Sequence, residues 1–174
     1  MTSIQACELA AHALLRKYQR AGAYADCYAT DVAGSVTHAE YVEAFYTTWV
    51  FKLERRLLAT FAGRASTDLQ ARELAAGRLS SFAAWNVEAR AQDQLLLSDF
   101  RGRTRSWLMV ALAPDTRSTR LFFGSAVVPI VDRHSGQASM GFAFRVLLGF
   151  HKLYSRVLLR AAVARLRRSR SSQP

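Results

Sequence analysis

Residues 82–113, FAAWNVEARAQDQLLLSDFRGRTRSWLMVALA, decide the fold, because apolar side chains recur there at about every second position. A period of two is typical of strands, whose side chains alternate between the two faces of a sheet. The later segment 119–131 is apolar on both faces, which predicts a central strand or one beside a cavity. Separated by short turns, the predicted strands cover 82–91, 94–101, 103–113 and 119–131. Four such strands in succession indicate an antiparallel meander.

Helices are predicted before and after this meander. Thr37 and Glu40 form a T-x-x-E capping box, which predicts a helix over 38–62. A long terminal helix over 142–167 has apolar residues on one side and cations on the other. The remaining predicted elements are helices over 3–20 and 67–76 and a short strand over 24–34.

This order of elements predicts an α+β fold in which a curved antiparallel sheet grips the long C-terminal helix, with an extra N-terminal helix. Such an arrangement leaves an elongated cavity between sheet and helix. The length of 174 residues favours one domain. We expect that domain over residues 1–168, followed by a disordered basic tail over 169–174.

The composition constrains compartment and partners. Residues 1–132 carry 15 cations and 13 acidic side chains, whereas the rest of the chain carries nine cations and no acid. Cys7 and Cys27 lie outside any paired or metal-ligand spacing, and the first 20 residues lack the features of a signal peptide. We therefore expect a cytoplasmic protein. The longest apolar stretch, 121–131, is too short for a membrane-spanning helix.

No familiar catalytic motif is present. The sequence contains no H-x-x-x-H, C-x-x-C, G-x-S-x-G or glycine-rich phosphate-loop pattern, and no dinucleotide fingerprint. We therefore predict no metal and no cofactor, and the sequence leaves open whether the protein is an enzyme.

Arg101, Arg103 and Arg105 occupy alternate positions, with Trp107 next in the series. One interpretation is a solvent-facing row with cross-strand acidic partners such as Glu88. The other is an anion site in which Arg105, farthest from the turn, binds the ligand's charge and Trp107 covers its apolar part.

The terminal helix offers two further candidates. His151 is either a neutral core histidine or a donor that polarises a ligand, with Tyr154 one turn away. The basic residues at its end either keep the protein soluble or make weak contacts with anionic membrane or nucleic acid.

The chain resembles the START-like (SRPBCC, helix-grip) superfamily, and in particular uncharacterised bacterial proteins of that kind. The resemblance spans roughly residues 24–166 and rests on GRTRSWLMV, TRLFFGSAVVP and the terminal segment FAFRVLLGFHKLYSRVLLRAA. The matching positions of that segment are Phe150, His151, Tyr154, Leu158, Leu159 and Arg160. The resemblance implies an apolar small molecule in the cavity, and in a few members cyclisation or hydrolysis there. The segment 3–20 is not part of the usual pattern.

We therefore predict a protein that binds an apolar or amphipathic, and in one version anionic, small molecule between sheet and C-terminal helix. The expected ligand-binding residues are Arg105, Trp107, His151, Tyr154, Trp85, Trp49 and Phe123. The alternatives are an enzyme of the same fold with His151 as acid or base, and a peripheral adaptor held by its basic C-terminal helix.

Overall fold

The computed structural model describes residues 3–62, 66–131, 138–139 and 142–171. One sheet of seven strands dominates it, in the order β1-β2-β7-β6-β5-β4-β3, with every neighbouring pair antiparallel. The strands are β1 (Gln5–Ala6), β2 (Tyr24–Ala33), β3 (Ser81–Phe82), β4 (Trp85–Ala91), β5 (Gln94–Asp99), β6 (Thr104–Leu112) and β7 (Ser118–Val127). A separate ladder joins β8 (Ile130–Val131) to β9 (Ala138–Ser139). The predicted meander is confirmed as β4 to β7.

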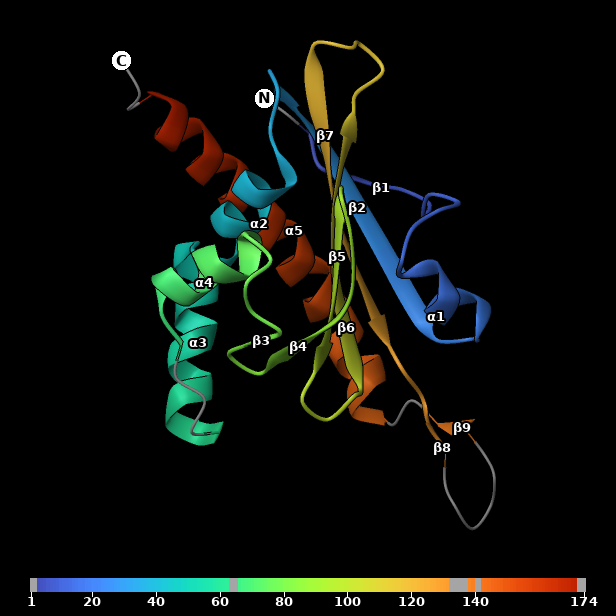
Figure 1. Ribbon diagram of the computed structural model, residues 1–174. Coiled ribbons are helices and arrows are strands. Elements are labelled where there is room, and N and C mark those ends of the chain that lie inside the picture. The colour runs from blue at the N-terminus through green and yellow to red at the C-terminus, as the bar shows by residue number, and fades with distance from the viewer. Residues whose placement is uncertain (1–2, 63–65, 132–137, 140–141, 172–174) are drawn as a thin grey trace.

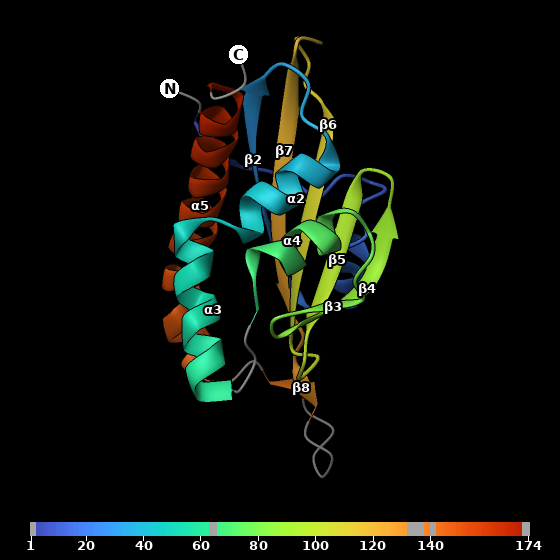
Figure 2. The ribbon, with the colours of Figure 1, turned by 60° about the vertical axis from the view of Figure 1, so that its left-hand side comes forward.

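The helices cover the two faces unequally. They are α1 (Arg16–Arg20), α2 (His38–Tyr46), α3 (Trp49–Ala62), α4 (Asp68–Ala75) and α5 (Phe142–Ser171). Figure 1 shows α2 to α5 on one side of the sheet and α1 on the other. In Figure 2, α5 runs beside α3 and along the β2 side of the sheet. The predicted α+β fold with a sheet and a long C-terminal helix is therefore confirmed, and it is consistent with a helix-grip fold that carries extra helices.

Strand alternation divides the apolar residues between two cores. The face under α2, α4 and α5, which we call the inner face, is packed with residues such as Tyr28, Leu108 and Phe123. The opposite, outer face carries Trp107 and Met109 and is covered by the N-terminal segment. β7 contributes Leu121 and Phe123 to the inner core and Phe122 and Ala126 to the outer core. This explains why β7 is apolar on both faces.

The predicted helix over 3–20 is wrong. Within residues 3–20 only Arg16–Arg20 are helical and only Gln5–Ala6 form a strand, and the rest is irregular or turn. Most of this segment packs on the outer face, and we call residues 3–20 the N-terminal cover. The buried side chain of Gln94 replaces part of the helical hydrogen bonding: its Oε1 accepts from the backbone N–H of Leu14 at 2.9 Å, and its Nε2 donates to the carbonyl of His12 at 3.3 Å. The outer face of the sheet thus buries apolar side chains of this segment and bonds part of its backbone.

The cover also requires Gly124. A Cβ at this position in β7 would lie 2.8 Å from the Trp107 ring and 2.9 Å from the Leu15 side chain. Only a glycine lets the cover approach β7 this closely.

The predicted helix over 38–62 begins as expected, with both hydrogen bonds of the Thr37–Glu40 capping box, but it is interrupted between α2 and α3. The Thr47 hydroxyl donates to the carbonyl of Glu43 at 2.6 Å, and the Thr48 hydroxyl accepts from the N–H of Phe51 at 3.2 Å. Threonine side chains that bond the backbone in this way compete with helical hydrogen bonds. The predicted helix over 67–76 is confirmed as α4, which has its own capping box.

The terminal helix is longer than predicted. It continues through Ser171, and Arg170 donates to the carbonyls of Ala33, at 2.8 Å, and Ser35. The expectation of a disordered tail is therefore wrong for 169–171, while 172–174 lie outside the described residues. Across the described ranges, no helix combines the length and apolar character needed to cross a membrane.

Candidate ligand-binding groove

The structure does not bring the predicted ligand-binding residues into one cavity. Arg105 and Trp107 point to the outer face, while Phe123 belongs to the inner core and both Trp85 and Tyr154 pack partly buried against it. Trp49 is 72% exposed on α3. His151 lies in α5, but the structure does not describe the position of its side chain. The prediction that all seven share a cavity between sheet and helix is therefore wrong for Arg105 and Trp107.

Arg105 is occupied by the protein itself. Its Nε lies 2.5 Å from Glu88 Oε2 and 2.7 Å from the Tyr18 hydroxyl oxygen, and its guanidinium lies over the Tyr18 ring. Lys17 adds a second ion pair to Glu88 at 2.5 Å. The predicted partner Glu88 is thus confirmed, but the face is covered by α1 rather than open to solvent. This cluster attaches the N-terminal cover and leaves Arg105 without the exposure that an anion site needs.

Trp107 is also structural. It is fully buried, and its indole Nε1 donates to Gln94 Oε1 at 2.9 Å. The same oxygen accepts from Leu14, so the indole and the cover share one anchor.

The inner face carries a polar row that crosses three strands. Asp26, Ser125 and Ser106 are successive cross-strand partners on β2, β7 and β6. Ser125 donates to Asp26 Oδ1 at 2.6 Å, and the hydroxyls of Ser106 and Tyr46 are 3.2 Å apart. Strand alternation puts Asp26 on the same face as Tyr24 and Tyr28. The row supplies hydroxyls and a carboxylate to a face that is otherwise mainly apolar.

A groove opens between the α2–α3 junction and the C-terminal half of α5. Its volume is about 430 Å³. The lining residues are Thr47, Thr48, Trp49, Lys52, Ala161, Ala164, Arg165, Arg168 and Ser169. They include three cations and an exposed indole but no carboxylate. The groove thus brings Trp49, a predicted ligand residue, beside cations from two helices.

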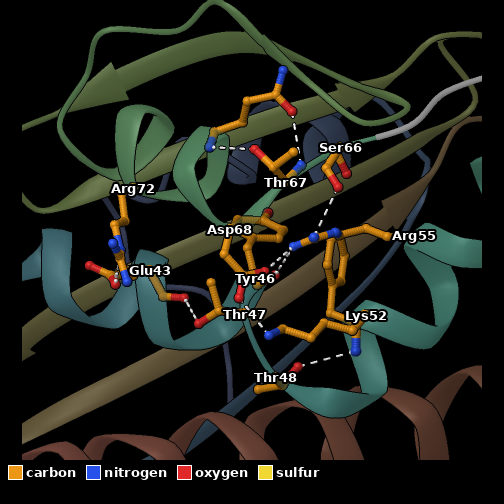
Figure 3. A network of polar contacts seen from close by, with 12 residues as sticks. Glu43, Tyr46, Thr47, Thr48, Lys52, Arg55, Ser66, Thr67, Asp68 and Arg72 are labelled. Atoms are coloured by element: carbon orange, nitrogen blue, oxygen red, sulfur yellow. Dashed lines mark hydrogen bonds and ion pairs between the residues drawn. The ribbon is translucent and has the colours of Figure 1, made fainter.

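Figure 3 shows how the α3 side of the groove is fixed. Asp68, at the start of α4, binds Lys52 at 2.5 Å and Arg55 at 2.9 Å, and Arg55 also donates to the carbonyl of Ser66 at 2.9 Å. Burial raises the pKa of the Asp68 carboxyl, but the hydrogen bonds from Lys52 and Arg55 lower it more, so the pKa lies below its ordinary value. Asp68 is therefore ionised, and it positions Lys52 at the groove.

The α5 side differs, because Arg165 is exposed and makes no hydrogen bond or ion pair within the described ranges. Its guanidinium is free to bind an oxyanion with two parallel hydrogen bonds. Sequence reasoning placed Arg165 and Arg168 only in a general cationic stripe, and it missed Lys52. Arg165 and Arg168 are three residues apart and so share one helix face, which was the available signal for these two residues.

No cluster of His, Cys, Asp or Glu among the described residues could hold a metal ion. The chain matches no protein-family model, and no curated protein matches it significantly.

Proposed function

We propose that the protein is a START-like, cytoplasmic binding protein for an amphipathic, anionic small molecule, which it holds against α5. The single observation that supports this most strongly is the groove in which Trp49 meets Lys52, Arg165 and Arg168 with no lining carboxylate. The helix-grip arrangement of sheet and α5 and the resemblance of the terminal segment support the same class of function. The cytoplasmic location rests on the scarcity of cysteine in the sequence.

The groove has the chemistry for such a ligand. About 430 Å³ lies within the range of roughly 300–1,000 Å³ typical of small-molecule sites. Arg165 and Arg168 would bind a carboxylate, sulfonate or phosphate, since a guanidinium fits these groups bidentately. The exposed indole of Trp49 would pack on the apolar or aromatic part of the ligand.

The test uses 1-anilinonaphthalene-8-sulfonate, an aromatic sulfonate whose fluorescence rises on binding. We expect saturable binding to the folded protein and a Kd weaker by about five- to thirtyfold for R165Q, because one charge-assisted hydrogen bond is worth about 1–2 kcal/mol. W49A should weaken binding as well and remove energy transfer from the one exposed tryptophan.

The matched control is R103Q, which removes the same charge from an exposed arginine in the turn before β6. Circular dichroism melts establish that the variants remain folded. If R165Q and R103Q give the same binding curve as the unmodified protein, the groove is not the site and the proposal fails.

A further inference from the structure

Cys7 and Cys27 are directly opposite each other where the N-terminal cover meets β2. The β1–β2 register pairs Gln5 with Ala29 and Ala6 with Tyr28, so the next pair in this antiparallel series is Cys7 with Cys27. The backbone N–H of Cys7 donates to the carbonyl of Cys27 at 3.0 Å, and the two sulfur atoms are 3.0 Å apart. Both thiols are free. The sequence spacing gave no sign of this pairing, because it arises only when the cover folds onto β2.

Backbone placement of this kind is compatible with a disulfide. Opposed residues of antiparallel strands have Cα atoms about 4.5–5.5 Å apart. Most disulfides join Cα atoms about 4.4–6.8 Å apart. The sulfur atoms could therefore be joined with little backbone movement.

The two thiols differ in access and acidity. Cys27 is buried, whereas Cys7 is partly exposed and lines a hollow of about 280 Å³ together with Asp31 and Arg120. The hydrogen bond from Cys27 lowers the pKa of the Cys7 thiol; burial opposes this, and the charge of Arg120 adds to it. The same hydrogen bond and burial raise the pKa of Cys27. Cys7 is thus the cysteine that ionises and that small oxidants can reach, whereas Cys27 stays protonated next to it.

We propose that Cys7 and Cys27 form a peroxide-reactive dithiol whose disulfide locks the N-terminal cover onto the sheet. The Cys7 thiolate attacks a hydroperoxide oxygen, so that an S–O bond forms and the O–O bond breaks, and Cys7 becomes a sulfenic acid. The departing alkoxide or hydroxide takes a proton from water and leaves as alcohol or water. The Cys27 sulfur then attacks the Cys7 sulfur and loses its proton, the S–O bond breaks, and water leaves. One hydroperoxide is reduced and two thiols are oxidised to one disulfide.

The disulfide would close a loop of the chain between Cys7 and Cys27. This loop contains Leu9, Leu15 and Tyr18, which pack on the outer face, so the disulfide would hold the cover against the sheet. Closing a loop of this length restricts the unfolded chain. We expect the oxidised protein to melt at a temperature higher by roughly 5–10 °C.

The experiment treats the full-length folded protein with hydrogen peroxide and measures intact mass without reductant. We expect the unmodified protein to lose two hydrogen atoms, to yield a Cys7–Cys27 peptide pair on digestion, and to return to its original mass and melting temperature with dithiothreitol. C27A, which keeps Cys7 but lacks its partner, should instead gain oxygen on Cys7. C7A should stay unoxidised under the same dose, because Cys27 is buried.

Three results would overturn the proposal: sulfinic acid on Cys7 while Cys27 can still be alkylated, a disulfide between two chains, or an internal disulfide that leaves the melting temperature unchanged. If C27A does not fold, alkylation mapping of the oxidised unmodified protein decides between these outcomes. Neither cysteine lines the ligand groove, so the test of the dithiol does not depend on the proposed function.

Discussion

At the scale of single residues, Glu88 connects more partners than any other carboxylate on the outer face within the described ranges. Its carboxylate forms ion pairs with Lys17 and Arg105 and accepts a hydrogen bond from the Tyr18 hydroxyl. Two of these partners come from α1 and one from β6, so the carboxylate joins the cover to the sheet. Alternation in the sequence correctly predicted that Arg105 and Glu88 could meet across strands. It could not predict the cover, because Lys17 and Tyr18 are about 70 residues away in the chain.

This cluster predicts a specific dependence of stability on pH. Burial raises the pKa of Glu88, but the hydrogen bonds from Lys17 and Tyr18 and the charge of Arg105 lower it more, so the pKa lies below its ordinary value of 4.5. A depressed pKa means that the contribution is complete above about 4.5 and is lost as the pH falls through the folded-state pKa. E88Q should cost about 1–3 kcal/mol at neutral pH, measured by urea unfolding, and the gap to the unmodified protein should narrow in acid.

E8Q provides the control, since Glu8 is an exposed carboxylate on the same segment. A difference between E88Q and the unmodified protein that stays constant from pH 7 to about pH 3 would show that packing, rather than the charge, is responsible.

At the scale of elements, the sequence predicts well where local chemistry decides the structure. The meander, β2, α4 and both helix starts with capping boxes follow from hydrophobic period and from short-range hydrogen bonds. The failures occur where distant partners compete with the local preference. Cys7, Leu14 and Tyr18 recur at helical spacing, yet they pack on a sheet face that forms from residues far along the chain.

Gln94 is a buried polar anchor of the N-terminal cover, which gives an element-scale prediction. Q94M keeps the volume but leaves the indole N–H of Trp107 and the N–H of Leu14 without their acceptor. Each buried donor left unsatisfied costs about 1–3 kcal/mol. We expect faster hydrogen exchange across residues 9–18 and a lower melting temperature.

Q92M is the matched control, because Gln92 lies exposed in the turn before β5. Exchange in the cover that is equally fast in Q92M and Q94M would mean that Gln94 is not its anchor.

At the scale of the whole molecule, the candidate groove depends on how α3 packs beside α5. Trp49 and Arg165 are more than 100 residues apart in the sequence and meet only through this packing. The sequence identified Trp49 as a ligand residue and the C-terminal arginines as a charged stripe. It could not combine them, because it predicted an uninterrupted helix over 38–62, whereas α3 begins after a break at Thr47 and Thr48.

The C-terminal end of α5 is part of the packed fold. Leu166 is buried in the inner core, and Arg170 binds the carbonyls of Ala33 and Ser35. Truncation after Ala164 should therefore lower the free energy of unfolding by about 2–4 kcal/mol, mainly through loss of the buried leucine. Chemical denaturation measures this, and truncation after Ser171, which removes only three residues, should leave the midpoint unchanged. Equal midpoints for both truncations would contradict this account of α5.

The outermost strands of the sheet, β1 and β3, are only two residues long each. Long bare edges invite strands of other molecules to add on, which is a common route to aggregates and fibrils. Each of β1 and β3 pairs with only two residues of the longer strand beside it, β2 or β4, and Figure 2 shows α5 running along the β2 side of the sheet. The outermost strands are therefore too short to template a long added strand, and the neighbouring edge at β2 is flanked by a helix.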